Sequence, residues 1–242
     1  MDARALHLWC ADPNDLLDAD AAQACAALLS AEEKARWQAF RFERHRREYL
    51  ATRALVRMAL SHYHPLPLAD WRFPRNAYGK PACDPDCGLR FNVSNTPNLV
   101  VCLVAQGREV GVDTEPCDRA ADILALAPEV FSPLELAGLE TLSALDKMDR
   151  ALSLWTLKES YIKARGMGLS LPLDKFSFVF NSTTDIALVL DPCLEDKPKR
   201  WQFGLLAYAG HRIAFMHERI ANVDLQLRPV WLTDNTNFLR KL

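Results

Sequence analysis

The sequence predicts an α+β protein made of two similar halves. Helix-like stretches are followed by short β-like runs twice along the chain, and this order is typical of α+β domains. The chain has 242 residues, half of them hydrophobic, which is enough for one large domain or two small ones. We expect an N-terminal half at 1–109 and a C-terminal half at 110–242, although no clear sequence repeat relates them.

The first half should begin with helices. An alanine-rich segment starts at Ala21, and Ser30-Ala-Glu-Glu matches a capping box that opens a second helix. An arginine-rich helical stretch continues to residue 60, and the segment His64-Pro-Leu-Pro-Leu ends it. Short β-like runs follow at 71–73, 89–93, 99–105 and 109–115. The third of these runs is apolar throughout, so we expect it to be a buried strand.

The second half repeats this order. Residues 119–165 should be helical, with Asp118 or Asp122 as possible caps, a helix start at Ser132-Pro133, and a stop at Gly166 and Gly168. Strands are expected at 175–180, 185–190, 201–208 and 211–217. The dipeptide Ala209-Gly210 should turn the last two strands into a hairpin.

Composition favours an ordinary globular protein of the cytoplasm. The seven cysteines are odd in number and scattered, which indicates a reducing compartment rather than a disulfide framework. Cys83 and Cys87 could start a zinc site only with two further ligands, and His62 and His64 are the only candidates nearby, so loop and core thiols are the simpler interpretation. Neither an export signal nor an apolar run of ~18 residues is present, so no membrane partner is expected.

Seven arginines lie between Arg36 and Arg57, a density that nucleic-acid-binding segments can also have. A solvated helix face is the commoner explanation, and Glu43 and Glu48 temper the positive charge. The formal net charge is only −2. Because neither a base-stacking motif nor a domain-wide basic excess accompanies the arginines, we expect no nucleic-acid partner.

Two carboxylates end the apolar run at 109–115. Asp113 and Glu115 are one residue apart, so in a strand both point to one face. Exposed strands often carry such pairs for solubility alone. Here the pair follows an apolar stretch, where unpaired buried charges are costly unless a cation or basic partners compensate. Carboxylates together with phosphate oxygens are typical ligands of Mg²⁺.

The segment from Trp155 to Leu169 carries a second pattern. Trp155, Glu159 and Lys163 recur at four-residue spacing, which places them along one stripe of a helix. Glu159 and Lys163 alone could form an ordinary surface ion pair. The tryptophan on the same stripe favours an inward-facing position for both. Lys158 lies about 100° round the helix and could face either a cleft or solvent.

These blocks, with four others, resemble one enzyme family. The two decisive blocks are Gly-Val-Asp-Thr-Glu at 111–115 and Trp-Thr-Leu-Lys-Glu-Ser-Tyr-Ile-Lys-Ala-Arg-Gly-Met-Gly-Leu at 155–169. The others are Tyr-Gly-Lys-Pro at 78–81, Phe-Asn-Val-Ser at 91–94, Phe-Ser-Pro-Leu-Glu at 131–135 and Leu-Ser-Leu-Pro-Leu-Asp at 169–174. Their order is similar to that in the 4′-phosphopantetheinyl transferases of the larger, surfactin-synthetase-activating type. The resemblance covers about Arg36 to Phe180.

The resemblance implies a function and a fold. It implies a monomeric pseudo-dimer with its active site in the cleft between the halves. The implied reaction moves the 4′-phosphopantetheine arm of coenzyme A onto a serine of an apo acyl or peptidyl carrier protein, and releases adenosine 3′,5′-bisphosphate. Mg²⁺ would be held by Asp113, Glu115 and Glu159. Glu159, directly or through a metal-bound water, would take the serine proton, while Lys163 and Lys158 would hold phosphate oxygens.

The coenzyme A adenosine end is implied to lie in the first half. One or more of Arg46, Arg47 and Arg53 would reach the 3′-phosphate, and Lys80 with the Ser94-Asn95 region would close around the adenosine. Family members commonly carry histidine after this serine. Asn95 can donate a hydrogen bond but cannot become cationic, so this departure puts the affinity for coenzyme A in question more than the chemistry.

Two other functional classes remain open on the sequence alone. A non-catalytic protein that binds coenzyme A or a carrier would keep the basic residues but lose a metal ligand, whereas all three carboxylates are present. A metal-dependent nucleotide hydrolase would share the carboxylates and lysines but would need a residue dedicated to activating water, and no further motif supplies one.

Overall fold

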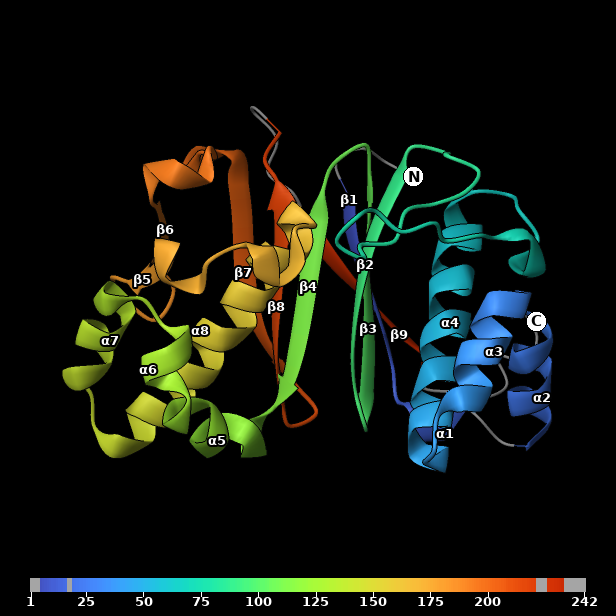
Figure 1. Cartoon of the computed structure of the whole chain (residues 1–242), viewed down its shortest axis with the longest axis horizontal. Coiled ribbons are helices and arrows are strands. Elements are labelled where there is room, and N and C mark those ends of the chain that lie inside the picture. Colours follow the sequence, from blue (N-terminus) through green and yellow to red (C-terminus); the bar gives the residue numbers. More distant parts are fainter. Residues whose placement is uncertain (1–4, 17–18, 221–225, 233–242) are drawn as a thin grey trace. The chain divides into compact units, whose positions relative to one another are not determined.

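The computed structural model describes residues 5–16, 19–220 and 226–232, which form two compact units (Figure 1). Unit 1 contains Met1–Val110 and Asn222–Leu242, and unit 2 contains Gly111–Ala221. Each unit combines helices with a β-sheet, so the predicted α+β class with two halves is confirmed. The expected boundary after residue 109 did not include the return of the chain to unit 1 at residue 222. The cleft expected between the halves stays a prediction.

Unit 1 is a four-stranded sheet with helices. Its strands are β1 (Ala5–Ala11), β2 (Leu89–Thr96), β3 (Leu99–Gln106) and β9 (Gln226–Leu232), in the order β2-β3-β1-β9. Strand β1 runs antiparallel to β3 and parallel to β9. The helices are α1 (Pro13–Leu16), α2 (Ala19–Ala27), α3 (Ala31–Ala39) and α4 (Glu43–Tyr63).

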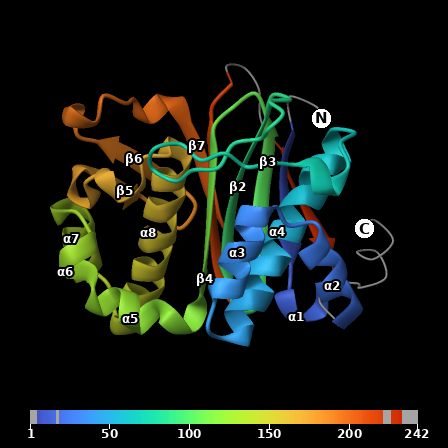
Figure 2. The same ribbon diagram turned by 45° about the vertical axis from the view of Figure 1, so that its right-hand side comes forward.

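The core of unit 1 lies between α4 and the sheet. Figure 2 shows α4 running along this sheet. Leu55, Val56 and Leu60 of α4 are fully buried, and they belong to the same cluster as Val100, Cys102 and Val104 of β3. Every residue of β3 from Leu99 to Ala105 is buried, as its apolar sequence predicts for a central strand.

Unit 2 contains two small sheets and the second long helix. Its strands are β4 (Val110–Pro116), β5 (Phe176–Phe180), β6 (Ile186–Leu190), β7 (Trp201–Tyr208) and β8 (His211–Glu218). Three of them pair in the order β4-β8-β7, and β5 pairs with β6. The helices are α5 (Ala120–Ala125), α6 (Ala127–Val130), α7 (Pro133–Glu140) and α8 (Ala144–Arg165).

Local signals account for several of these element boundaries. Ser30 and Ser132 each cap a helix through a complete capping box. Gly166 ends α8 in the left-handed conformation. Ala209 and Gly210 both have positive φ and turn β7 into β8, as predicted. Asp118 and Asp122 were wrong as helix caps, because the cap position of α5 is Arg119.

Two strands were not predicted, and one predicted strand is reduced to a bridge. Strands β1 and β9 come from the two ends of the chain. The run at 71–73 contributes only an isolated bridge between Arg72 and Asp84. Within the described part of the chain, every helix is too short or too polar to span a lipid bilayer.

Candidate active site

Strand β4 carries both predicted carboxylates on the face that packs against α8. Gly111, Asp113 and Glu115 alternate along this strand and therefore share one face. A Cβ atom on Gly111 would lie 2.0 Å from the Ser160 carbonyl oxygen and 2.4 Å from the Ala164 nitrogen, both in the backbone of α8. The absence of a side chain thus lets the strand lie directly on the helix, which brings Asp113 and Glu115 beside it.

Helix α8 meets these carboxylates with the predicted stripe. The Trp155 indole Nε1 donates a hydrogen bond to Glu115 Oε1 at 2.9 Å. Glu159 lies about one helical turn after Trp155, and Lys163 lies about one turn further along the same stripe. Lys163 Nζ donates a hydrogen bond to Asp113 Oδ1 at 2.6 Å. The lysine therefore contacts a carboxylate of the strand.

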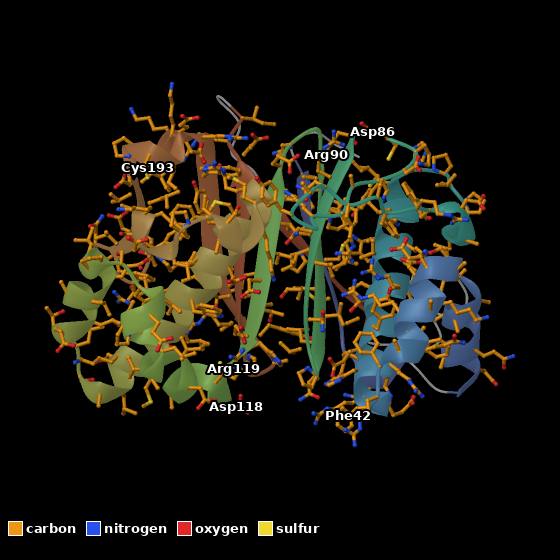
Figure 3. The ribbon with its side chains drawn as sticks, viewed as in Figure 1. Phe42, Asp86, Arg90, Asp118, Arg119 and Cys193 are labelled. Atoms are coloured by element: carbon orange, nitrogen blue, oxygen red, sulfur yellow. The ribbon has the colours of Figure 1, made fainter. Side chains whose placement is uncertain are left out.

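The site concentrates negative charge. The pKa of Glu159 is raised to about 6, first by burial and then by the charge of Asp113, which outweighs the opposing effect of Lys163; Glu115 raises it further. Asp113 is only 4% exposed. Arg119 Nη1 donates to Glu115 Oε2 at 2.7 Å and lies beside Asp118 at the start of α5 (Figure 3).

The donor chemistry of this cluster suits a divalent cation. Three carboxylates are ligands that Mg²⁺ accepts, and the pKa of Glu159 is raised first by burial and then by the neighbouring carboxylates, whose repulsion a cation would relieve. The side chains as they lie are not a preformed cage: among the described residues, no three His, Cys, Asp or Glu side chains are grouped closely enough to hold a metal ion. Lys163, Trp155 and Arg119 hold oxygens of the two β4 carboxylates.

Lys158 occupies a different position from the one predicted. Its side chain is completely buried, facing neither solvent nor the β4 carboxylates. The ammonium donates to Glu135 Oε2 and to the Phe176 carbonyl oxygen, both at 2.7 Å, and lies 4.2 Å from the centroid of the Phe176 ring. Burial lowers its pKa, and the Glu135 charge opposes this effect.

This buried pair joins three elements of unit 2. Glu135 is the third residue of α7, and its Oε2 also accepts the backbone N–H of Ser132 to close the capping box. Its Oε1 accepts the backbone N–H of Phe178 in β5 at 2.9 Å. Lys158 adds α8, so the pair anchors α7 and β5 to the long helix. We therefore leave Lys158 out of the phosphate-binding residues.

The predicted coenzyme A residues of unit 1 are spread over several elements. Arg46 donates to the Phe40 carbonyl oxygen at 2.9 Å, and Arg47 donates to Asn14 Oδ1 at 3.2 Å. Lys80 donates to Glu109 Oε2 at 2.5 Å. Ser94 is buried and Asn95 is exposed on β2, so adjacent positions on the strand point to opposite faces.

Arg53 is the predicted arginine that lines a cavity. This cavity has a volume of about 250 Å³, and its wall includes the arginines Arg36, Arg53, Arg72 and Arg75. Tyr49, Trp71, Phe73, Glu32, Glu33 and Asp84 also line it. We call it the arginine pocket. The pKa of Arg75 is lowered, first by burial and then by the positive charges of Arg53 and Arg36, so the cations crowd one another.

Sequence reasoning missed most of the arginine pocket. Arg36 comes from α3, Tyr49 and Arg53 from α4, and Arg72 and Arg75 from the segment after α4. No fixed spacing connects these positions. The density of arginines between Arg36 and Arg57 was the available signal, but it did not identify which side chains converge.

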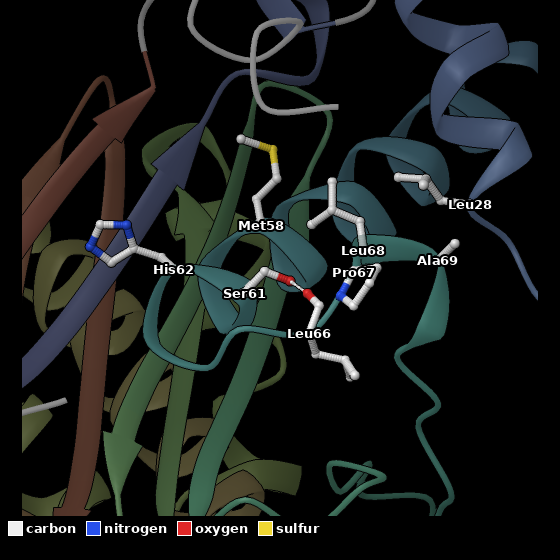
Figure 4. A pocket seen from close by; sticks show the side chains of 8 residues that line it. All are labelled: Leu28, Met58, Ser61, His62, Leu66, Pro67, Leu68 and Ala69. Atoms are coloured by element: carbon white, nitrogen blue, oxygen red, sulfur yellow. Dashed lines mark hydrogen bonds between the residues drawn. The ribbon is translucent and has the colours of Figure 1, made fainter.

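A larger pocket of unit 1 is apolar and contains none of the residues expected to bind coenzyme A or Mg²⁺ (Figure 4). Its volume is about 670 Å³, and aliphatic side chains from α4 and the segment after it form most of its wall. The Ser61 hydroxyl is already used there, because it donates to the Leu66 carbonyl oxygen and accepts from the Trp71 indole.

Two family models match the chain. The model of the 4′-phosphopantetheinyl transferase superfamily matches residues 109–216, and the model of the N-terminal part of 4′-phosphopantetheinyl transferase matches residues 18–107. The chain is 34% identical over 168 residues to the 4′-phosphopantetheinyl transferase HetI of a Nostoc species, an alignment that covers 68% of this chain and 70% of HetI. The chain belongs to the 4′-phosphopantetheinyl transferase superfamily. The predicted family and enzyme class are thereby confirmed.

Other relatives agree with this assignment. The 4′-phosphopantetheinyl transferase Sfp of Bacillus subtilis is 31% identical, over 69% of this chain and 75% of Sfp. Among solved structures, holo-[acyl-carrier-protein] synthase from Neisseria meningitidis matches with a TM-score of 0.40 and 14% identity, over 46% of this chain and 98% of that chain. A similarity at this level adds nothing to the sequence relationships.

Proposed function

We propose that this protein transfers the 4′-phosphopantetheine group of coenzyme A to a serine hydroxyl of an apo carrier protein, with Mg²⁺ at Asp113, Glu115 and Glu159. The second product is adenosine 3′,5′-bisphosphate. The observation that carries this proposal is the contact of β4 with the α8 stripe, where Lys163 pairs with Asp113 and Trp155 with Glu115. Glu159 lies on the same stripe, with its pKa raised by burial and then by both strand carboxylates.

Each residue of the cluster has a role in the proposed reaction. Glu159 accepts the proton of the carrier serine as the serine hydroxyl oxygen attacks the pantetheine-side phosphorus. Lys163 is the cation that can turn from Asp113 to a phosphate oxygen and stabilise charge on the leaving group. Trp155 and Arg119 orient Glu115. Mg²⁺, when bound, would neutralise the diphosphate and lower the barrier to attack.

The arginine pocket supports a site for the 3′-phosphate of coenzyme A in unit 1. Guanidinium groups match phosphate geometry through paired N–H donors. Arg53 and Arg57 share Glu33, with Arg57 Nη2 2.5 Å and Arg53 Nη1 3.8 Å from its carboxylate oxygens, so Arg53 is held at the pocket wall. Of the three arginines expected at the 3′-phosphate, we favour Arg53. Tyr49, whose ring lies 5.0 Å from the Arg53 guanidinium carbon, gives an aromatic face beside it.

Exposed leucines in the helical region of unit 2, from the end of α5 to the start of α8, support carrier docking. Leu126, Leu134 and Leu145 are 44%, 50% and 75% exposed. Lys147 lies nearby in the sequence and is held by Glu140. Phe131 is buried, and the Arg150 guanidinium carbon lies 3.8 Å from the centroid of the Phe180 ring, so we leave both residues out of this surface. We propose that the exposed leucines meet an apolar strip on an acidic carrier helix.

A mass measurement on carrier proteins tests the proposal. The protein is incubated with coenzyme A, Mg²⁺ and a panel of apo carriers, each of which is then weighed intact. At least one carrier should gain the mass of one phosphopantetheine group, and chelation of the metal should abolish the gain. Binding of coenzyme A or carrier without any mass gain would favour a non-catalytic binding protein. Release of nucleotide products without carrier modification would favour a hydrolase.

A further inference from the structure

The thiols of Cys83 and Cys87 lie together in unit 1, outside the proposed site. Cys83 is 6% exposed and belongs to the core cluster of unit 1, and the more exposed Cys87 packs against the same cluster. Directly after Cys87, Gly88 N donates to Asp86 Oδ1 at 3.0 Å, and Gly88 has a φ of +74°. All the cysteines of the described chain are in the reduced form.

This thiol pair lies at the base of a hairpin that forms one wall of the arginine pocket. The backbones of Arg72 and Asp84 exchange two hydrogen bonds, at 3.0 and 3.1 Å, and Ala82 N donates to the Pro74 carbonyl oxygen at 2.9 Å. Arg72, Phe73, Pro74, Arg75 and Asp84 of this hairpin line the pocket. Cys83 lies between Ala82 and Asp84, so displacement of its Cα acts directly on the ladder that holds Arg72.

We propose that Cys83 and Cys87 form a dithiol that closes reversibly to a disulfide, and that closure weakens anion binding in the arginine pocket. Closure must bring the two sulfurs to bonding distance, ~2 Å, which moves the backbone at Cys83. The disulfide chemistry does not depend on the proposed function. The effect of closure on coenzyme A binding rests on the proposed function.

The reaction is a thiol–disulfide exchange with a low-molecular-weight disulfide such as oxidised glutathione. Cys87, the more accessible thiol, attacks as thiolate and forms a mixed disulfide, and one glutathione thiolate leaves. Burial, followed by the Cys87 charge, raises the pKa of Cys83 to about 12, while the Arg90 guanidinium opposes this. Cys83 then attacks the Cys87 sulfur and expels the second glutathione. Two protein thiols are oxidised, and one disulfide is reduced to two thiols.

Peptide mapping gives a direct readout. Trypsin should release residues 76–90 as one peptide, because Lys80 is followed by proline, and Cys83 and Cys87 are the only cysteines in it. After treatment of the folded protein with oxidised glutathione, this peptide should lose the mass of two hydrogen atoms and regain it with dithiothreitol. A Cys87 that keeps a stable glutathione adduct, with Cys83 still a thiol, would overturn the proposed dithiol.

The consequence for the pocket is measured on the same oxidised sample. The KM for coenzyme A should rise severalfold while kcat at saturating coenzyme A stays unchanged. The Cys87→Ser variant should be insensitive to the oxidant, and Cys117→Ser, which removes an exposed cysteine of unit 2, should respond like the wild type. Disulfide formation with an unchanged KM would overturn the coupling to the pocket. A reduced protein without any transferase activity would instead refute the proposed function and leave the mass result intact.

Discussion

At the scale of single residues, burial separates two lysines that the sequence treated alike. Lys158 and Lys163 are five residues apart on α8, and both were expected at phosphate oxygens. The four-residue spacing predicted that Lys163 shares a stripe with Trp155 and Glu159, and this is confirmed. The position of Lys158 could not be predicted, because its partner Glu135 lies 23 residues away and reaches it only through the packing of α7 on α8.

Replacing Lys158 by methionine tests this assignment. The Lys158→Met variant keeps most of the side-chain volume but leaves the Glu135 carboxylate buried without its cation, so the free energy of unfolding should fall by about 3–5 kcal/mol. Adding Glu135→Gln should recover part of this loss. Urea denaturation of both variants measures the effect. Stability close to that of the wild type together with a large fall in kcat would return Lys158 to the phosphate site.

At the scale of elements, the contact of β4 with α8 depends on one glycine. A Gly111→Ala substitution would place a methyl group against two backbone atoms of α8, which cannot rotate away. Strand and helix must separate, so we expect a loss of about 1–3 kcal/mol in stability and a marked loss of transferase activity. Thermal denaturation and initial rates measure the two effects.

Gly138 supplies the matched control for this substitution. It is in α7, and a Cβ atom there would meet nothing within 4 Å. Gly138→Ala should therefore raise stability by ~0.5–1 kcal/mol through the better helix propensity of alanine. Equal responses of the two variants would mean that Gly111 is not a close-approach position.

The short helices of unit 2 give a second prediction at this scale. Leu134 is 50% exposed on α7, so Leu134→Glu should leave the fold intact and place a negative charge on the proposed docking surface. The KM for the carrier protein should rise much more than the KM for coenzyme A. Val189→Glu, at a position of similar exposure on β6, is the control and should change neither value. Equal rises in both KM values for Leu134→Glu would remove this surface from the account.

At the scale of the whole molecule, the sequence predicted the order of helices and strands better than their partners. Strand β9 pairs with β1, the first strand of the chain, and local sequence carries no signal for a pairing over that separation. The arginine pocket could not be predicted for the same reason, because its arginines come from three separate segments of the chain. By contrast, capping boxes, turns and apolar runs are local signals, and the elements they define were found.

The pH dependence of stability is also a property of the whole chain. Burial raises the pKa of Asp196, but hydrogen bonds from Trp201, from the Lys197 N–H and from Tyr161, and then the Arg165 charge, outweigh it and hold the pKa below its usual value. A lowered carboxyl pKa contributes stability that is full above the unfolded value, ~3.9, and is lost as the pH falls through the folded value. The protein should therefore lose stability below about pH 4.

Two variants isolate this effect, one in each unit. Asp196→Asn in unit 2 and Glu33→Gln in unit 1 should each lower stability at neutral pH and flatten its acid dependence. The pKa of Glu33 is also below its usual value. Burial alone would raise this pKa, but the hydrogen bond from Arg57 and its positive charge lower it by more. Hydrogen exchange between about pH 6 and pH 3 resolves the segments concerned. An acid dependence as steep in both variants as in the wild type would contradict the assignment.

The central claim is that Asp113 and Glu159 hold the magnesium that transfer requires, and the turnover of isosteric variants tests it most directly. Initial rates of carrier modification are measured over a range of Mg²⁺ concentrations for Asp113→Asn and Glu159→Gln, with circular dichroism to check the fold. Each variant should lose far more than tenfold in kcat at every Mg²⁺ concentration, and Glu115→Gln should be milder because water can replace one ligand. A folded Asp113→Asn or Glu159→Gln variant that kept more than about a tenth of wild-type turnover, a loss below ~1.4 kcal/mol in transition-state stabilisation, would contradict the claim.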